Sequence, residues 1–76
     1  MDTMKQIDVD GNMLEITMES DFQYTISIND NIKIETNDTI FKGTLIVIDD
    51  FDIQIRTENN IIETIAFDEI RTISYV

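Results

Sequence analysis

The sequence predicts a small all-β domain, and the period of its apolar residues and its turn residues carry this prediction. Apolar side chains stand at every second position in three successive segments, residues 14–18, 22–28 and 32–34. This period places them on one face of a strand. Asp10 and Gly11 precede the first of these segments and supply the backbone conformations of a tight type I′ turn. Asn and Asp residues then mark further turns near residues 21 and 29–31.

The second half of the chain continues the strand pattern. Residues 40–48 are apolar on both faces, which is typical of a central or bent strand, and Gly43 within them favours a bend. Shorter strands are expected near residues 51–57, 61–66 and 71–76, with a single 3₁₀ turn at residues 67–70. We therefore expect one domain over residues 1–76, an antiparallel meander that closes into a small barrel. Residues 1–30 would form an extra N-terminal hairpin and a strand, and residues 31–76 the barrel core.

Length and composition limit how such a domain is stabilised. A chain of 76 residues holds one thin core, and the absence of cysteine and histidine leaves no disulfide and no histidine-bound metal to support it. We expect barrel closure or self-association to supply the rest, and hence a homo-oligomer. The first five residues lack the pattern of a leader, and no apolar run reaches the roughly 20 residues of a membrane span. A cytoplasmic protein without membrane contact is the expectation.

The charge of the chain is strongly biased. Sixteen acidic residues face five basic ones, which gives a formal net charge of −11. Proteins that bind nucleic acid do so by neutralising phosphates with Lys and Arg, and the summed field of this chain would repel a polyanion. Direct nucleic-acid binding is therefore disfavoured. Solubility alone and a functional acidic surface both remain as explanations of the acidity.

Residues 41–52 and 70–73 carry a resemblance to a known family. The order aromatic-x-Gly-x-Leu at residues 41–45, followed after three residues by Asp49, resembles the first signature of the Sm-like family. Ile-Arg-x-Ile at residues 70–73 is similar to the end of its second signature. The resemblance covers residues 31–76 and implies a Sm-like or SH3-like small barrel. It does not extend to RNA recognition, because Ala66 and Phe67 replace the family's Arg-Gly pair and Asp52 replaces its base-binding Asn.

The densest group of acidic residues lies between two predicted strands. It consists of Asp49, Asp50 and Asp52 around Phe51. Such a group can bind a hard cation or raise one carboxyl pKa by repulsion, and it can equally be a solvated turn. The Asp/Asn-rich segment 8–12 has its glycine at the fourth position rather than the sixth, which does not fit a calcium loop. We expect no metal, no cofactor and no catalytic activity, because nothing indicates a cleft with paired acids.

The aromatic residues divide into two groups. Their positions in the alternation predict burial for Phe22, Tyr24, Phe41 and Phe67. Exposure is expected for Phe51, which lies inside an acidic turn, and for Tyr75, which lies next to the terminus. Exposed aromatic residues at turns are typical of protein interfaces. The predicted protein-binding residues are therefore Asp49, Asp50, Phe51, Asp52 and Tyr75, and their charge favours a partner with a basic surface.

Three functional hypotheses follow. The first is a non-catalytic acidic barrel that acts through protein–protein contact, such as a phage or bacterial accessory inhibitor of a nucleic-acid-handling enzyme. The second is a ring-forming protein that sequesters a small molecule such as a nucleotide, in which cations converge on phosphate. Its predicted ligand-binding residues are Lys33, Lys42, Arg56 and Arg71. The third is a divergent Sm-like RNA binder. This hypothesis predicts measurable binding to uridine-rich RNA, and we expect none.

Overall fold

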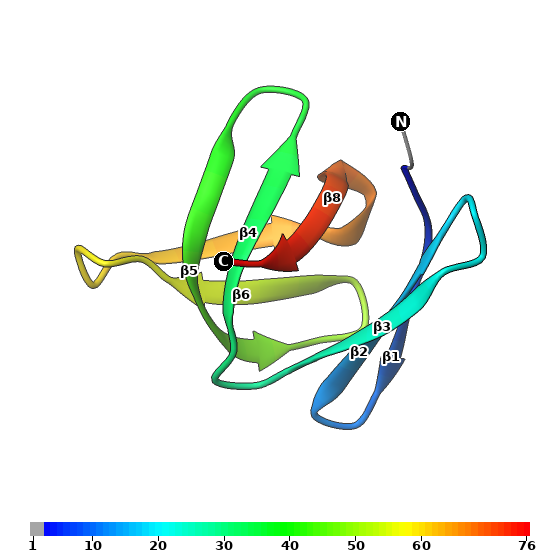
Figure 1. The fold of residues 1–76 in the computed structure, drawn as a ribbon. Coiled ribbons are helices and arrows are strands. Elements are labelled where there is room, and N and C mark those ends of the chain that lie inside the picture. Colours follow the sequence, from blue (N-terminus) through cyan, green and yellow to red (C-terminus); the bar gives the residue numbers. More distant parts are fainter. Residues whose placement is uncertain (1–2) are drawn as a thin grey trace.

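A computed structural model describes residues 3–76 and contains eight antiparallel strands and one 3₁₀ turn within them (Figure 1). The all-β prediction and the single 3₁₀ turn are confirmed. The elements, in chain order, are β1 (Met4–Asp10), β2 (Met13–Met18), β3 (Gln23–Ser27), β4 (Asn31–Thr36), β5 (Ile40–Ile48), β6 (Asp52–Arg56), β7 (Ile62–Ala66), η1 (Phe67–Glu69) and β8 (Ile70–Tyr75). Residues 1 and 2, part of the segment considered for a leader, lie outside the described residues.

The strands form two sheets rather than one closed cylinder. The first sheet has the order β1-β2-β3 and the second the order β7-β6-β5-β4-β8. Within residues 3–76, no ladder joins β7 to β8, so both are edges of an open sheet and the expected barrel closure by strand pairing is not observed. In Figure 1 the first sheet lies across the second, and buried residues of both sheets form one apolar core, which is covered without closure of the strands.

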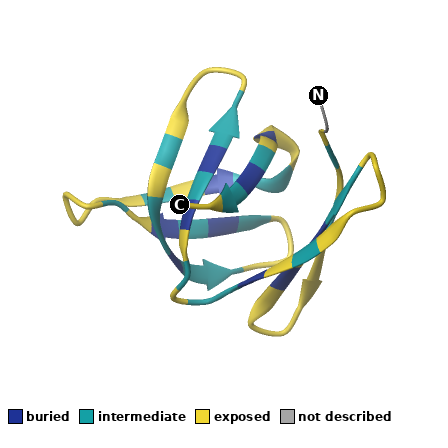
Figure 2. Ribbon diagram, viewed as in Figure 1, coloured by how far each residue is buried: buried dark blue, intermediate teal, exposed yellow. Residues whose placement is uncertain are grey.

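The core lies between the two sheets and is built almost wholly from isoleucine. Leu14, Ile16 and Ile26 point inward from the first sheet, and each is fully buried (Figure 2). The second sheet contributes Ile32, Ile34, Leu45, Ile53, Ile55, Ile65, Ile70 and Ile73. Branched side chains at every second position suit a pleated, half-buried surface. The alternation in the sequence therefore identified the inner faces of β2 and β4 correctly.

Four turn residues with positive φ set the connections. Gly11 has φ of 63° and, with Asn12, forms the two-residue loop between Asp10 and Met13. Glycine at the first central position fits a type II′ turn, so the predicted type I′ turn centred on Asp10 and Gly11 is wrong by one residue and by turn type. Asp21, Asn29 and Asn60 have φ of 70°, 79° and 61°, in agreement with the turns predicted from Asn and Asp.

Gly43 is needed for a close approach between strands. A Cβ atom at this position would lie 2.5 Å from the carbonyl oxygen of Arg56 and 2.9 Å from its carbonyl carbon. The irregularity in β5 lies further along, where the register with β6 shifts between Leu45 and Val47. The glycine therefore lets the end of β6 pass close to β5, and the bulge itself falls near Ile46.

Hydrogen bonds tie the two sheets together. The chain passes from β3 to β4 through Asn29, whose backbone N–H donates to the carbonyl of Leu45 at 2.8 Å, and the Leu45 N–H donates to the carbonyl of Asp30 at 3.0 Å. Tyr24 of β3 donates its hydroxyl to the carbonyl of Ile73 in β8. Tyr75 of β8 donates to the carbonyl of Thr25 in β3. The two tyrosines thus make reciprocal bonds between the sheets.

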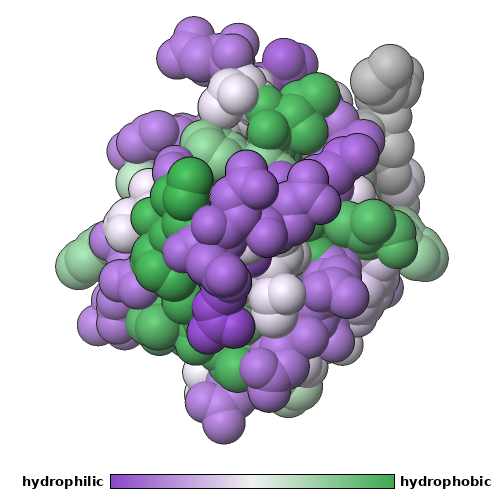
Figure 3. Space-filling view, turned by 90° about the vertical axis from the view of Figure 1, so that its left-hand side faces the viewer, coloured by the Kyte–Doolittle hydropathy of each residue, from purple (hydrophilic) through white to green (hydrophobic). Residues whose placement is uncertain are grey.

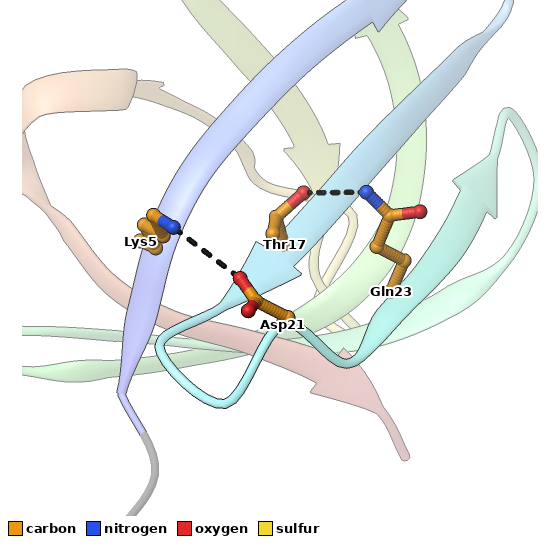
Figure 4. Close-up of polar contacts among 4 residues, drawn as sticks. All are labelled: Lys5, Thr17, Asp21 and Gln23. Atoms are coloured by element: carbon orange, nitrogen blue, oxygen red, sulfur yellow. Dashed lines mark hydrogen bonds and ion pairs between the residues drawn. The ribbon is translucent and has the colours of Figure 1, made fainter.

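The outward side of the first sheet is polar. Lys5 of β1 lies 3.3 Å from the carboxylate of Asp21, and Gln23 of β3 donates to the hydroxyl of Thr17 at 3.4 Å (Figure 4). Asp8 of β1 pairs directly with Glu15 of β2, and both carboxylates are exposed. These contacts span the strands from the solvent side, opposite the apolar core.

The aromatic predictions had mixed outcomes. Tyr24, Phe41 and Phe67 are half-buried and pack against the core. Phe22 was predicted to be buried, which is wrong: its side chain is 62% exposed and its ring contacts Tyr24 at a centroid distance of 5.9 Å. It lies in the β2–β3 turn, directly after Asp21 with its positive φ, and thus outside the strand whose alternate residues are buried.

Candidate functional site

The acidic turn, defined as residues 49–52, connects β5 to β6 and presents one aromatic ring to solvent. The backbone N–H of Asp49 donates to the carbonyl of Asp52 at 2.9 Å, and the N–H of Phe67 donates to the carbonyl of Phe51 at 3.0 Å. The Phe51 side chain is nevertheless 82% exposed, as the sequence predicted for it. The turn is therefore fixed through its backbone, while its ring and the carboxylates of Asp49 and Asp50 face solvent.

Further acidic residues lie beside this turn. Asp52 pairs with Ala66 at the end of β7, and η1 follows with exposed Asp68 and Glu69. The end of the second sheet that carries Phe51 is thus surrounded by carboxylates. Within residues 3–76, no group of three or more Asp, Glu, His or Cys side chains is arranged to hold a metal ion.

Tyr75 does not join the acidic turn. It is the last residue of β8, whereas the turn is bonded to Phe67, which precedes that strand. The Tyr75 ring is 55% exposed, but its hydroxyl is occupied by the carbonyl of Thr25. Partial burial and the nearby carboxylate of Asp30 raise its pKa. The structure therefore separates the five predicted protein-binding residues into a turn of four and an inter-sheet tyrosine.

Three of the four predicted ligand-binding cations share the outer face of the second sheet. Lys33 of β4 pairs directly with Lys42 of β5, and both point outward because Ile32 and Ile34 point inward. Arg56 of β6 pairs with Thr44, two residues along from Lys42 and on the same face. This places Lys42 and Arg56 on a cross-strand diagonal of about 7–8 Å.

Arg71 lies apart from this group. The register between β4 and β8 shifts at residues 35 and 36, so that Arg71 falls between the pairs Glu35–Thr72 and Thr36–Ile70. It is exposed at the beginning of β8, near η1. The fourth cation of the predicted set therefore does not reach the other three within one chain.

A surface pocket of about 430 Å³ lies beside Lys42 and Arg56. The side of the molecule that carries the β6–β7 turn in Figure 1 faces the viewer in Figure 3, where hydrophilic side chains surround apolar patches. Its neutral members could not be predicted from the sequence, because only the strand register brings them to the two cations. The pocket is lined by Asn31, Lys42, Gly43, Thr44, Arg56, Thr57, Glu58, Asn60 and Val76.

Comparison of the chain with protein-family models, with curated proteins and with solved structures gives no match. Among residues 3–76 there is no helix long and apolar enough to cross a membrane. The fold and its surface define a small all-β, two-sheet domain with two separate candidate sites. They are the acidic turn and the pocket beside Lys42 and Arg56, named the basic pocket.

Proposed function

We propose that this protein is a non-catalytic binding domain that acts through protein–protein contact, with the acidic turn as its contact surface. The observation that carries the proposal is the Phe51 ring, 82% exposed within a turn whose backbone is held by two hydrogen bonds. A rigid, exposed aromatic side chain loses little conformational entropy on binding and buries a large apolar area. Phe51 is therefore suited to be the anchor of an interface.

The charge around Phe51 determines which partner suits this surface. Asp49 and Asp50 are exposed beside the ring, and Asp68 and Glu69 follow in the adjoining η1. Complementary charge steers a partner to a surface and suppresses partners of like charge. A basic protein surface therefore fits the acidic turn, and the net charge of −11 adds to the attraction. Enzymes that handle nucleic acids carry such surfaces, which favours an accessory inhibitor as the biological role.

We further propose that residues 31–76 are a divergent, open version of a Sm-like or SH3-like barrel. Three features support this relation: the sheet order β7-β6-β5-β4-β8, the long β5 with Gly43, and η1 immediately before β8. Self-association remains part of the proposal, because β7 is a free edge that carries the exposed Ile62 and is preceded by the exposed Ile61.

Affinity capture from a bacterial lysate tests the protein-contact proposal. The bait is the full chain, at about 50 mM and about 500 mM salt, since screening shortens the reach of surface charge. We expect basic partners that are lost at the higher salt concentration and lost with Phe51→Ser. Phe22→Ser is the matched control, because Phe22 is also an exposed aromatic residue but lies in the β2–β3 turn, away from the acidic turn in the sequence. Partners that are neither basic nor salt-sensitive, or that bind Phe51→Ser unchanged, would count against the proposal.

A further inference from the structure

We propose that the pocket beside Lys42 and Arg56 binds a small phosphorylated molecule that also carries hydroxyl groups, of the class of sugar phosphates and nucleoside monophosphates. This inference does not depend on the acidic turn, which lies at the other end of β6. The pocket volume of about 430 Å³ is within the range of small-ligand sites.

Two cations give the pocket its positive charge. Of the five basic residues in the chain, Lys33, Lys42 and Arg56 share one sheet face. Lys33 is neutralised by Glu35 at 3.4 Å, whereas Lys42 and Arg56 have no ion-pair partner within residues 3–76. Lys42 and Arg56 are like charges on a cross-strand diagonal. An oxyanion bound between them would offset their mutual repulsion, and the guanidinium of Arg56 can bind it in a bidentate manner.

Neutral hydrogen-bond donors line the pocket beside the two cations. Thr44 donates its hydroxyl to Oδ1 of Asn31 at 2.9 Å, which leaves the amide group of Asn31 free to donate. The hydroxyl oxygen of Thr57 accepts from the backbone N–H of Ile61 at 3.3 Å, so its own hydrogen is free to donate. Asn31 and Thr57 line the same pocket as Lys42 and Arg56, and together these four side chains can complete the shell around a phosphate group.

The pocket also contains a hydrogen-bond acceptor for the rest of the ligand. Glu58 lies in the β6–β7 turn and lines the pocket as an acceptor, with Asn60 beside it. A carboxylate accepts hydrogen bonds from ligand hydroxyls and repels additional phosphates. The pocket therefore favours one phosphate with neighbouring hydroxyl groups over a polyphosphate. The net charge of −11 opposes the approach of an anion, but at physiological salt this field is screened beyond about 8 Å.

Amide chemical shifts of the full chain, titrated at physiological salt, test the proposal. The probes are ribose 5-phosphate, adenosine 5′-monophosphate, inorganic phosphate and unphosphorylated adenosine. We expect saturable shifts confined to residues near 31, 42–44 and 56–60 with the two phosphorylated compounds, weaker binding of inorganic phosphate, and none with adenosine. The absence of saturable shifts with either phosphorylated compound would overturn the site, and equal binding of inorganic phosphate would overturn the role of Glu58.

Charge-matched variants separate this pocket from general electrostatic attraction. Arg56→Gln and Lys42→Gln should each lower the affinity about tenfold, because each removes a charge-assisted hydrogen bond. Lys5→Gln changes the net charge equally but removes a cation that pairs with Asp21 on the first sheet, so the affinity should stay the same. An equal loss of affinity with Lys5→Gln, or no loss with either pocket variant, would overturn the proposal.

Discussion

The two tyrosines between the sheets offer the sharpest test of how this small domain holds together. Tyr24 donates its hydroxyl to Ile73, and Tyr75 donates to Thr25, so β3 and β8 exchange two side-chain hydrogen bonds. Each phenylalanine replacement removes one hydroxyl and keeps the ring. The perturbation is thus confined to the bonds between the sheets.

The expected magnitude follows from the burial of the two hydroxyls. One hydrogen bond contributes about 0.5–1.5 kcal/mol to the free energy of unfolding. Tyr24 is half-buried and belongs at the upper end of this range, whereas Tyr75 is mostly exposed and belongs at the lower end. The double replacement should lower the free energy of unfolding by about 2 kcal/mol, which corresponds to roughly 8–16 °C in Tm for a domain of this size.

The same pair predicts a loss of stability in alkali. Burial, and then the charge of Tyr75, raise the pKa of Tyr24 from its ordinary value of 10.0, and the pKa of Tyr75 is also raised. Between the ordinary and the raised pKa, the folded chain keeps protons that the unfolded chain has released. The contribution of the tyrosines is therefore fully present below about pH 10 and is lost as the pH rises through the raised pKa values.

Urea denaturation followed by circular dichroism, from about pH 8 to above pH 11, measures this effect. The wild-type free energy of unfolding should fall more steeply above about pH 10 than that of the Tyr24→Phe, Tyr75→Phe double variant. These are the two tyrosines of the chain, so absorbance of tyrosinate reports their titration directly. An identical alkaline slope in both proteins, or an unchanged midpoint at pH 8, would refute the reasoning.

Three further predictions concern the unfolding free energy measured by urea denaturation at neutral pH. Gly43→Ala should destabilise the domain by about 1–3 kcal/mol, because the added Cβ would lie 2.5 Å from a backbone atom. Gly11→Ala should lower the free energy of unfolding by about 1 kcal/mol, because its Cβ enters open space but its φ is 63°. A larger loss at Gly11 than at Gly43 would contradict the close approach of β5 and β6. Ile55→Ala should cost about 2–5 kcal/mol because Ile55 is fully buried, and a loss below 1 kcal/mol would argue against a packed core there. Phe51→Ser should change stability by less than about 0.5 kcal/mol, and a larger loss would show that the ring supports the fold rather than an interface.

Local strand structure could be predicted from the sequence because its signals are local. The apolar segment 40–48 coincides with β5, and the Asn and Asp turns adopt the positive φ that their side chains tolerate. The alternation of apolar residues placed Ile32 and Ile34 on one face, and both are fully buried in the core. These features depend on the period of a strand and on turn chemistry, which a few neighbouring residues determine.

The pairing of strands could not be predicted in the same way. Alternation defines the inner face of a strand but not its neighbour, so a closed barrel and two crossed sheets are compatible with one pattern. The chain turns at Asn29 with φ of 79°, and the first sheet then covers the core that closure would otherwise have to enclose. Phe22 shows the related error, since it lies in the turn before β3 and not in the strand to which the alternation assigned it.

The charged residues of the candidate sites could be predicted from the sequence, but which of them lie together in space could not. The acidic turn is contiguous in sequence, so its exposure could be anticipated. The basic pocket depends on register: Lys33 meets Lys42, and Arg56 reaches the same face through Thr44, while a register shift removes Arg71. The charges were visible in the sequence, but only strand pairing decides which of them share a face.

The strand β6 separates the two sites, so we expect their proposed functions to be independent. Asp52, part of the acidic turn, begins the strand, and Arg56, part of the pocket, ends it. Four residue steps along a strand span about 13 Å. Ligand affinity should therefore be unchanged in Phe51→Ser, and partner capture should be unchanged in Arg56→Gln. If each variant instead impaired both functions, the two surfaces would have to belong to one continuous interface, because neither substitution removes a buried side chain.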